Sequence, residues 1–206
     1  MLERAKAVTR HQQRTSVEYA RFADDLVVLV NGHPQQRWLR TAVEQRLREE
    51  LATLQVEVNE EKSRRVDLTQ GESFGFLGFE FRRVLSRQGL WMPLRIPKAK
   101  KRTALLGTLR AVFRRFQSQP VSRLIDEINP ILRVWVNYFA MGHSSRCFAF
   151  IRDWVEKKIR SHLARACQRR GFGWKRWSRE WLYETLGLFN KYHITYRPSP
   201  TAVPIP

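Results

Sequence analysis

Two neighbouring aspartates, Asp24 and Asp25, interrupt a stretch that otherwise has the composition of β-strand. The stretch "YARFADDLVVLV" covers residues 19–30, and its β-branched and aromatic residues predict a hairpin over residues 17–30 with the acids at its turn. Aspartate is a common turn residue because its carboxylate accepts hydrogen bonds from nearby backbone N–H groups. A turn chosen for geometry alone would more often be Asn-Gly or Asp-Gly. An ordinary turn and a functional acidic pair therefore both remain open.

A divalent cation would give the acidic pair a chemical purpose. Two carboxylates held by rigid strands repel each other, and a bound cation relieves that repulsion. Hard oxygen ligands favour Mg²⁺, which keeps several waters and also binds substrate phosphates. Two such ions about 3.5–4 Å apart activate an attacking oxygen and stabilise a leaving oxygen in polymerases and nucleases. Asp24 and Asp25 are therefore candidate catalytic Mg²⁺ ligands.

The charge of the chain favours a polyanionic partner. The 206 residues include 38 Lys and Arg against 19 Asp and Glu, a formal net charge of +19. Residues 1–80 hold 12 basic and 13 acidic residues, so 26 basic and 6 acidic residues lie in residues 81–206. This bias favours nucleic acid. The longest aliphatic run, Leu26 to Val30, is too short for a bilayer and no signal-peptide core is present, which predicts a cytoplasmic protein without a membrane partner.

The first part of the chain has the pattern of an α+β domain. An amphipathic helix is predicted between Trp38 and Leu54, because apolar residues recur there at spacings of three and four residues. Short strands are predicted within residues 54–68 and 73–85. Residues 1–16 are polar without a clear period and are predicted to be a poorly defined helix or coil.

The second part has a helical pattern throughout. Residues 91–102 contain two prolines and a basic cluster and are predicted to be a linker, followed by a helical bundle over residues 103–197 and an extended tail over residues 198–206. Pro120 and Pro130 are expected at or near helix starts. The apolar faces of the three helices are Leu105, Leu109, Val112 and Phe116; Leu124, Ile128, Leu132, Trp135 and Phe139; and Phe148, Ile151, Val155, Ile159 and Leu163.

An ordered set of sequence blocks resembles group II intron-encoded reverse transcriptases, also called maturases. The blocks are "YARFADD", "NEEKS", "FGFLGF", "INPILRVWVNYF" and "GFGWKRWSREWLYETLGL", and the resemblance covers about residues 17–197. The resemblance implies that residues 17–90 are the carboxyl-terminal part of a reverse-transcriptase palm. Residues 103–197 would then be the helical thumb, called the maturase-specific or X domain.

The resemblance also assigns roles to the palm residues. Asp24 would be the second metal-binding aspartate and Asp25 its neighbour. Lys62, in "NEEKS", would protonate the leaving pyrophosphate, although a solvated surface lysine is an equal alternative. Phe22 stands where the family more often has tyrosine and would pack beside the incoming nucleotide.

The turn in "FGFLGF" matches the primer grip of the family. Phe76, Leu77 and Gly78 would meet the primer terminus there, because a glycine lets the backbone approach closely. The alternative is a simple β-turn packed on the core, and both can hold at once.

One metal ligand of the family has no counterpart in this pattern. The other metal-binding aspartate comes from an upstream palm strand, preceded by fingers that hold nucleotide and template, whereas residues 1–16 contain one acid, Glu3. The resemblance therefore implies a carboxyl-terminal part of a reverse transcriptase that binds Mg²⁺ weakly and does not polymerise alone. Its partners would be intron RNA, an RNA template with a DNA primer, deoxynucleotides and an amino-terminal palm and fingers polypeptide.

Basic residues of the second part are expected to contact RNA phosphates. The outer face of the third helix is predicted to be mostly basic. It holds four residues that lie off the apolar stripe: Arg152, Glu156, Arg160 and Arg169. Trp174, Trp177 and Trp181 could stack on bases, but their spacing suits a core and most are expected there. The candidate RNA-binding residues are Lys98, Lys100, Lys101, Arg102, Arg152, Arg160, Arg169, Lys175, Arg176 and Arg179.

Parts of the sequence are also compatible with functions other than a polymerase. A zinc site at His143, Cys147, His162 and Cys167 lacks the tight cysteine knuckles of structural zinc, so ordinary packing accounts better for these residues. An RNA-binding maturase module without catalysis is the main alternative, and a DNA-binding protein of another kind is a third. Neither alternative explains the acidic hairpin, because docking on nucleic acid has no use for paired carboxylates.

Overall fold

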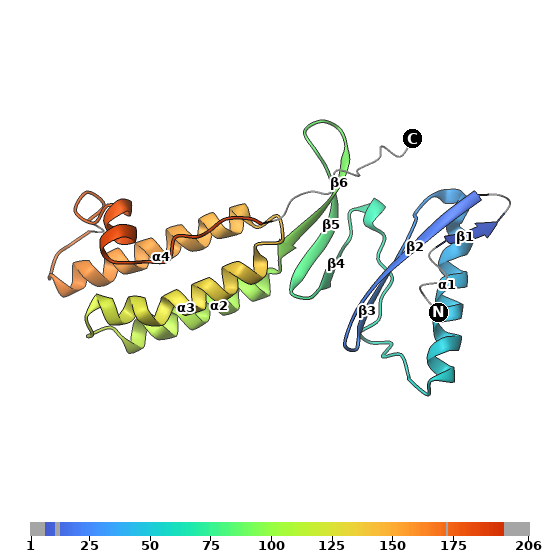
Figure 1. Cartoon of the computed structure of the whole chain (residues 1–206), viewed down its shortest axis with the longest axis horizontal. Coiled ribbons are helices and arrows are strands. Elements are labelled where there is room, and N and C mark those ends of the chain that lie inside the picture. Colours follow the sequence, from blue (N-terminus) through green and yellow to red (C-terminus); the bar gives the residue numbers. More distant parts are fainter. Residues whose placement is uncertain (1–6, 11–12, 172, 196–206) are drawn as a thin grey trace. The chain divides into compact units, whose positions relative to one another are not determined.

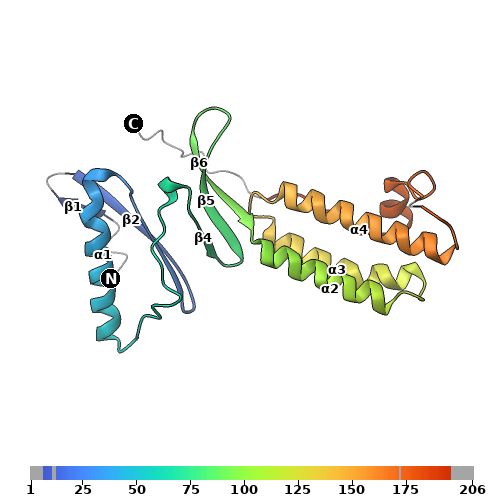
Figure 2. The same cartoon turned by 180° about the vertical axis from the view of Figure 1, so that it is seen from behind.

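The computed structural model describes residues 7–10, 13–171 and 173–195, and these mix helix and sheet as the α+β composition predicts. Figure 1 shows the chain from one side and Figure 2 from behind. Within the described residues, no helix is both long and apolar enough to span a membrane.

The chain divides into two compact units. The first comprises Met1–Phe76 with Arg82–Met92, and the second comprises Leu77–Phe81 with Pro93–Pro206.

The first unit begins with a three-stranded antiparallel sheet in the order β1-β2-β3. Its strands are β1 (Ala7–Arg10), β2 (Gln13–Phe22) and β3 (Asp25–Val30). Val17 faces Val30 in the β2–β3 register, and Val17 is buried, which fits the preference of β-branched residues for a pleated, packed surface. The predicted hairpin over residues 17–30 is therefore confirmed.

Two predictions for the first unit are wrong. Residues 7–10 and 13–16 are strand, not helix or coil, because antiparallel pairing supplies backbone hydrogen bonds that a polar sequence does not reveal. Residues 54–67 form turns and irregular backbone in place of the short strand expected there. This stretch is rich in charged residues and pairs with no strand in the described part of the chain.

Helix α1 (Arg37–Thr53) confirms the amphipathic helix predicted from the sequence. Leu39 is only 1% exposed, whereas Leu54 lies just beyond the helix and is 68% exposed. The helix ends where Gln55 adopts a positive φ of 54°, a conformation that α-helical backbone cannot continue.

A second sheet has the order β4-β5-β6, with β4 (Ser73–Phe76), β5 (Phe79–Leu85) and β6 (Trp91–Pro97). Strands β4 and β5 confirm the strands predicted within residues 73–85. Residues 91–102, expected as a linker, instead form β6 and the start of a helix. The prolines misled the prediction because β6 is an edge strand, where a missing N–H is tolerated.

The second unit contains the three helices α2 (Ala99–Arg115), α3 (Val121–Phe139) and α4 (Ser145–Ala166), which pack against one another (Figure 1). The predicted apolar faces meet in one core, confirming the helical pattern. Pro120 lies directly before α3, as expected. Pro130 lies inside α3, so its expected place near a helix start is wrong. Its exposed position lets the lost backbone hydrogen bond be replaced by water.

The chain after α4 is largely irregular, which differs from the all-helical bundle predicted over residues 103–197. Its described part contains one short π-helix, Trp181–Thr185. The segment then runs back along α3: the Phe189 N–H donates to Asn129 Oδ1 at 2.8 Å, and the Thr195 N–H donates to the Ala140 carbonyl at 3.0 Å. The tail predicted over residues 198–206 lies outside the described residues.

Candidate metal site and RNA interface

The two aspartates lie at the tip of the β2–β3 hairpin. Ala23 and Asp24 form the turn, and Asp25 begins β3 opposite Phe22. Ala23 has a positive φ of 53°, and the Arg21 Nε donates to its carbonyl at 2.9 Å, which holds the turn. Both aspartates are exposed. The hairpin thus presents two adjacent carboxylates to solvent.

The chemistry of this pair fits Mg²⁺ only in part. Exposed carboxylate oxygens are suitable hard ligands, but the described residues include no group of three or more His, Cys, Asp or Glu side chains arranged for a metal ion. Asp24 and Asp25 could therefore fill part of a coordination shell. Phe22 is 63% exposed beside them. Lys62 is also exposed, and its backbone N–H donates to the Asn59 carbonyl and side chain at 3.2 and 3.1 Å.

The turn matched to a primer grip joins β4 to β5. Leu77 and Gly78 have φ values of 47° and 77°, the positive pair that a two-residue hairpin turn requires. The Tyr138 hydroxyl donates to the Leu77 carbonyl at 2.8 Å, and the Lys98 N–H donates to the Gly78 carbonyl at 2.9 Å. The structural alternative, a turn packed on the core, therefore holds for Leu77 and Gly78. Phe76 is half-buried at the end of β4.

Four cations gather at the beginning of α2. Lys98 precedes the helix, Lys100 and Lys101 are exposed in its first turn, and Arg102 is partly exposed. No acidic residue lies in that turn. Cations at a helix N-terminus oppose the helix dipole, by roughly 0.3–1 kcal/mol each at exposed sites. A bound polyanion would relieve this repulsion, which fits the predicted phosphate contacts.

The predicted outer face of α4 is wrong at two positions. Glu156 is 0% and Arg160 is 1% exposed, so neither side chain is available to RNA. Arg160 Nη1 donates to Glu156 Oε2 at 3.2 Å, and its Nε donates to the Trp177 carbonyl at 2.9 Å. Their sequence spacing of four was the signal for this pair. The chain that follows α4 covers them, and a helical wheel does not show that cover.

Glu156 is the centre of a hydrogen-bond network that sequence reasoning missed. Its Oε1 accepts from Arg179 Nε at 2.8 Å and from the Tyr183 hydroxyl at 2.6 Å. Burial favours the neutral acid, but the hydrogen bonds from Tyr183, Arg179 and Arg160 outweigh it and lower the pKa of Glu156. Burial and the bond to Glu156 raise the pKa of Tyr183. The network fastens residues 177–183 to α4.

The remaining basic candidates are at the surface. Arg169, Lys175 and Arg176 are exposed. Arg152 is partly exposed and lies 3.4 Å from Asp153, so part of its charge is already compensated. Arg179 is half-exposed and also lies 3.2 Å from Asp153.

The three tryptophans divide between core and surface. Trp177 is 8% exposed and Trp181 is half-buried against the core, as expected for most of them. Trp174 is 53% exposed, with the Arg160 guanidinium 4.1 Å from its ring centroid.

The histidines and cysteines considered for zinc have other surroundings. His162 is buried, with Nε2 3.1 Å from the Gln119 carbonyl, and His143 Nδ1 accepts from the Arg95 N–H at 3.2 Å. Burial raises the pKa of the half-buried Cys147 thiol. Cys167 is exposed.

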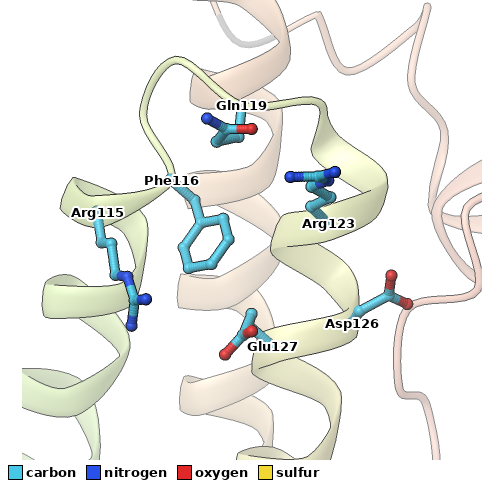
Figure 3. A pocket seen from close by; sticks show the side chains of 6 residues that line it. All are labelled: Arg115, Phe116, Gln119, Arg123, Asp126 and Glu127. Atoms are coloured by element: carbon cyan, nitrogen blue, oxygen red, sulfur yellow. The ribbon is translucent and has the colours of Figure 1, made fainter.

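A cavity of about 490 Å³ lies where α2 is followed by α3 (Figure 3). The Phe116 ring lies between Arg115 and Arg123, and Arg115 and Glu127 extend along the space below the ring. Asp126 points away from the ring. Two arginines and two carboxylates line the cavity, so its lining has no net charge and does not favour a polyanion.

Comparison with known proteins bears on the helical unit. No curated protein matches the chain. Residues 102–182 match the family model of the group II intron, maturase-specific domain. The match begins in α2, includes all of α3 and α4, and ends in the π-helix. The match covers 81 of the 206 residues and supports the resemblance of this part of the chain to group II intron maturases.

Proposed function

We propose that the chain binds group II intron RNA and helps it fold for splicing. The observation that carries this proposal is the match to the maturase-specific domain, which falls within the part of the chain that holds the excess positive charge. Exposed cations at the start of α2 and around Lys175 would neutralise phosphates and release counterions. Phosphate contacts of this kind position an RNA, and its folded shape would supply the selectivity.

Binding to a group II intron RNA tests the proposal. The chain is expected to bind this RNA more tightly than an unrelated structured RNA of equal length, and to speed splicing at limiting Mg²⁺. Replacing Lys100, Arg169, Lys175 and Arg176 together by glutamine should flatten the slope of log K against log salt, by about 0.7–0.9 for each lost phosphate contact. Equal affinity for both RNAs without faster splicing would contradict the maturase role.

We further propose that the β2–β3 hairpin contributes to a two-metal RNA-directed DNA polymerase site. Support comes from its two exposed, adjacent carboxylates between rigid strands. Asp24 and Asp25 would hold Mg²⁺, which would activate the primer hydroxyl and neutralise the leaving pyrophosphate. Phe22 would pack beside the deoxynucleotide, Lys62 would protonate the leaving group, and Phe76, Leu77 and Gly78 would meet the primer. A palm and fingers polypeptide would supply the further ligands and hold the RNA template.

Reconstitution with separately produced amino-terminal palm and fingers of a related enzyme tests the metal role. We expect primer extension on an RNA template from the mixture and no extension by the 206-residue chain alone. Asp24→Asn should abolish extension while RNA binding stays nearly unchanged. Glu18→Gln is the matched control, because it removes an exposed carboxylate from the same hairpin away from the tip. An Asp24→Asn mixture as active as the parent would refute the role.

A further inference from the structure

We propose that a surface shared by α2 and α4 binds an unpaired segment of RNA, with phosphates on its cations and a base stacked on Phe150. This surface, the α2–α4 seam, is defined by Arg102, Arg110, Phe150, Trp154 and Lys158. The inference rests on the proposed RNA-binding function and names a site for it.

Cation–π contacts organise the seam. The Arg102 guanidinium carbon lies 5.0 Å from the Phe150 ring centroid, so a cation of α2 lies over one face of an aromatic ring of α4. Arg110 from α2 and Lys158 from α4 each lie 5.6 Å from the Trp154 ring centroid. Residues eight positions apart in a helix are separated by about 12 Å along its axis. Arg102 and Arg110 therefore place two cations at separate positions along α2, each beside an aromatic ring of α4.

The cations of the seam have unused hydrogen-bonding capacity. Within the part of the chain that the structure describes, Arg102, Arg110 and Lys158 form no ion pair with a carboxylate. An aromatic face attracts a cation without consuming its N–H donors. These donors remain available to phosphate oxygens, and the rings limit the entropy lost when a phosphate binds.

The aromatic rings differ in exposure, and this difference points to an unpaired strand. Phe150 is 47% exposed, although it lies on a helix whose other aromatic residues pack inward. Trp154 is half-buried, and its edge-to-face contact with Phe113 at 6.1 Å fixes it on α2. Stacking requires a base whose face is accessible, as in single-stranded RNA and not within a duplex. The seam combines such a ring with three cations that can bind phosphates, Arg102, Arg110 and Lys158.

Fluorescence anisotropy of the full chain with a labelled single-stranded RNA of about 12 nucleotides, within the site sizes typical of single-strand binding, tests the seam. Phe150→Ala should weaken binding at least about fivefold, and Phe150→Leu should also weaken it because leucine keeps an apolar side chain without a stacking face. Replacing Arg102, Arg110 and Lys158 by glutamine should reduce the salt slope by about 2. A photoreactive thiouridine in the RNA should crosslink to Phe150.

A charge-matched triple variant serves as the control. Arg123, Arg133 and Lys191 are exposed cations that are not part of the seam, and their replacement by glutamine removes the same net charge. This control should keep a salt slope close to that of the wild type. Thermal unfolding of every variant would show whether the fold is retained, and the crosslink on the unmodified chain gives a result that is independent of any substitution.

The outcomes separate the seam from the general RNA-binding role. Suppose that the wild-type chain binds group II intron RNA, that the seam variants bind like the control, and that no crosslink forms at Phe150. This result would overturn the seam proposal and leave the general RNA-binding role standing. Equal competition by duplex RNA together with an unaffected Phe150→Ala variant would do the same, as would seam-dependent binding to anionic lipid vesicles and not to RNA. Failure of the wild-type chain to bind any RNA would overturn both proposals.

Discussion

At the scale of single residues, Glu156 places a fully buried carboxylate in the second unit. Its oxygens accept from Arg160, Arg179 and Tyr183, and Arg160 is itself buried. A buried ion pair is weak support for stability by itself, but removal of one partner leaves the other charge buried and uncompensated. The network therefore makes the fold of the second unit sensitive to this one side chain.

We predict that Glu156→Gln lowers the free energy of unfolding at pH 7 by about 3–5 kcal/mol, because Arg160 then stays buried without a counter-charge. The folded state lowers the pKa of Glu156 below its ordinary value of 4.5. Its contribution is therefore fully present above that pH and is lost as the pH falls through the folded-state pKa. Urea denaturation between pH 7 and pH 3 should show the two proteins converging in acid.

The control for this prediction is Glu127→Gln, which changes an exposed carboxylate of α3. It should alter stability by less than about 0.5 kcal/mol. A difference between wild type and Glu156→Gln that stays constant down to pH 3 would show that Glu156 does not stabilise the fold through its charge.

At the scale of elements, Gly142 shows how closely the connection after α3 packs on the second unit's sheet residues. A Cβ at this position would lie 2.8 Å from Phe79 Cε1 and 2.9 Å from the Arg95 carbonyl oxygen. Real Cβ atoms do not come so close, and a backbone oxygen cannot rotate away. The contact is between parts of the chain that lie far apart in sequence, so the glycine is required by tertiary packing.

We predict opposite effects of two glycine-to-alanine changes in the second unit. Gly142→Ala should lower stability by about 1–3 kcal/mol, because the methyl group overpacks its site. Gly107 lies inside α2, and a Cβ added there would meet no atom within 4 Å. Gly107→Ala should therefore raise stability by about 0.5–1 kcal/mol through the better helix propensity of alanine. Chemical denaturation measures both, and equal stability of the two variants would contradict the packing argument.

At the scale of the whole molecule, charge is unevenly distributed along the chain: residues 81–206 hold 26 basic and 6 acidic residues, against 12 and 13 in residues 1–80. Protease-sensitive sites are expected where backbone is exposed and unpaired. The described chain offers such backbone in residues 54–67 and in the described part of residues 167–176, and both segments contain basic residues.

Limited digestion with trypsin should therefore cut first after basic residues of these irregular segments. Cleavage after Arg95 or Lys98 should be slower, because β6 and the start of α2 are held by backbone hydrogen bonds, including Lys98 N–H to the Gly78 carbonyl at 2.9 Å. Mass spectrometry of the first fragments reports the order. Initial cleavage within residues 91–98 would show that this segment behaves as the flexible linker that the prolines suggested.

The sequence by itself determined the helices, the acidic hairpin and the excess of charge. Ile128 and Ile151 lie on apolar stripes with helical spacing, and both are fully buried. Asp24 and Asp25 precede a β-branched run and lie at a hairpin tip. These features are local, because a helix or a tight turn is encoded by residues a few positions apart. Phe150 and Trp154 are four residues apart within the predicted third helix, but the sequence does not show the arginines of α2 that face their rings.

Only the tertiary structure decided which charges and strands acquire partners. Glu156 and Arg160 have the composition of a solvated helix face, yet the chain after α4 buries them. Trp91–Pro97 has the composition of a linker, but in the structure it is a strand that pairs with β5. From the sequence, Arg102 is indistinguishable from a solvated cation, whereas in the structure its guanidinium lies over the Phe150 ring of α4. In each case the free energy comes from a contact between residues distant in sequence, and no local periodicity records such a contact.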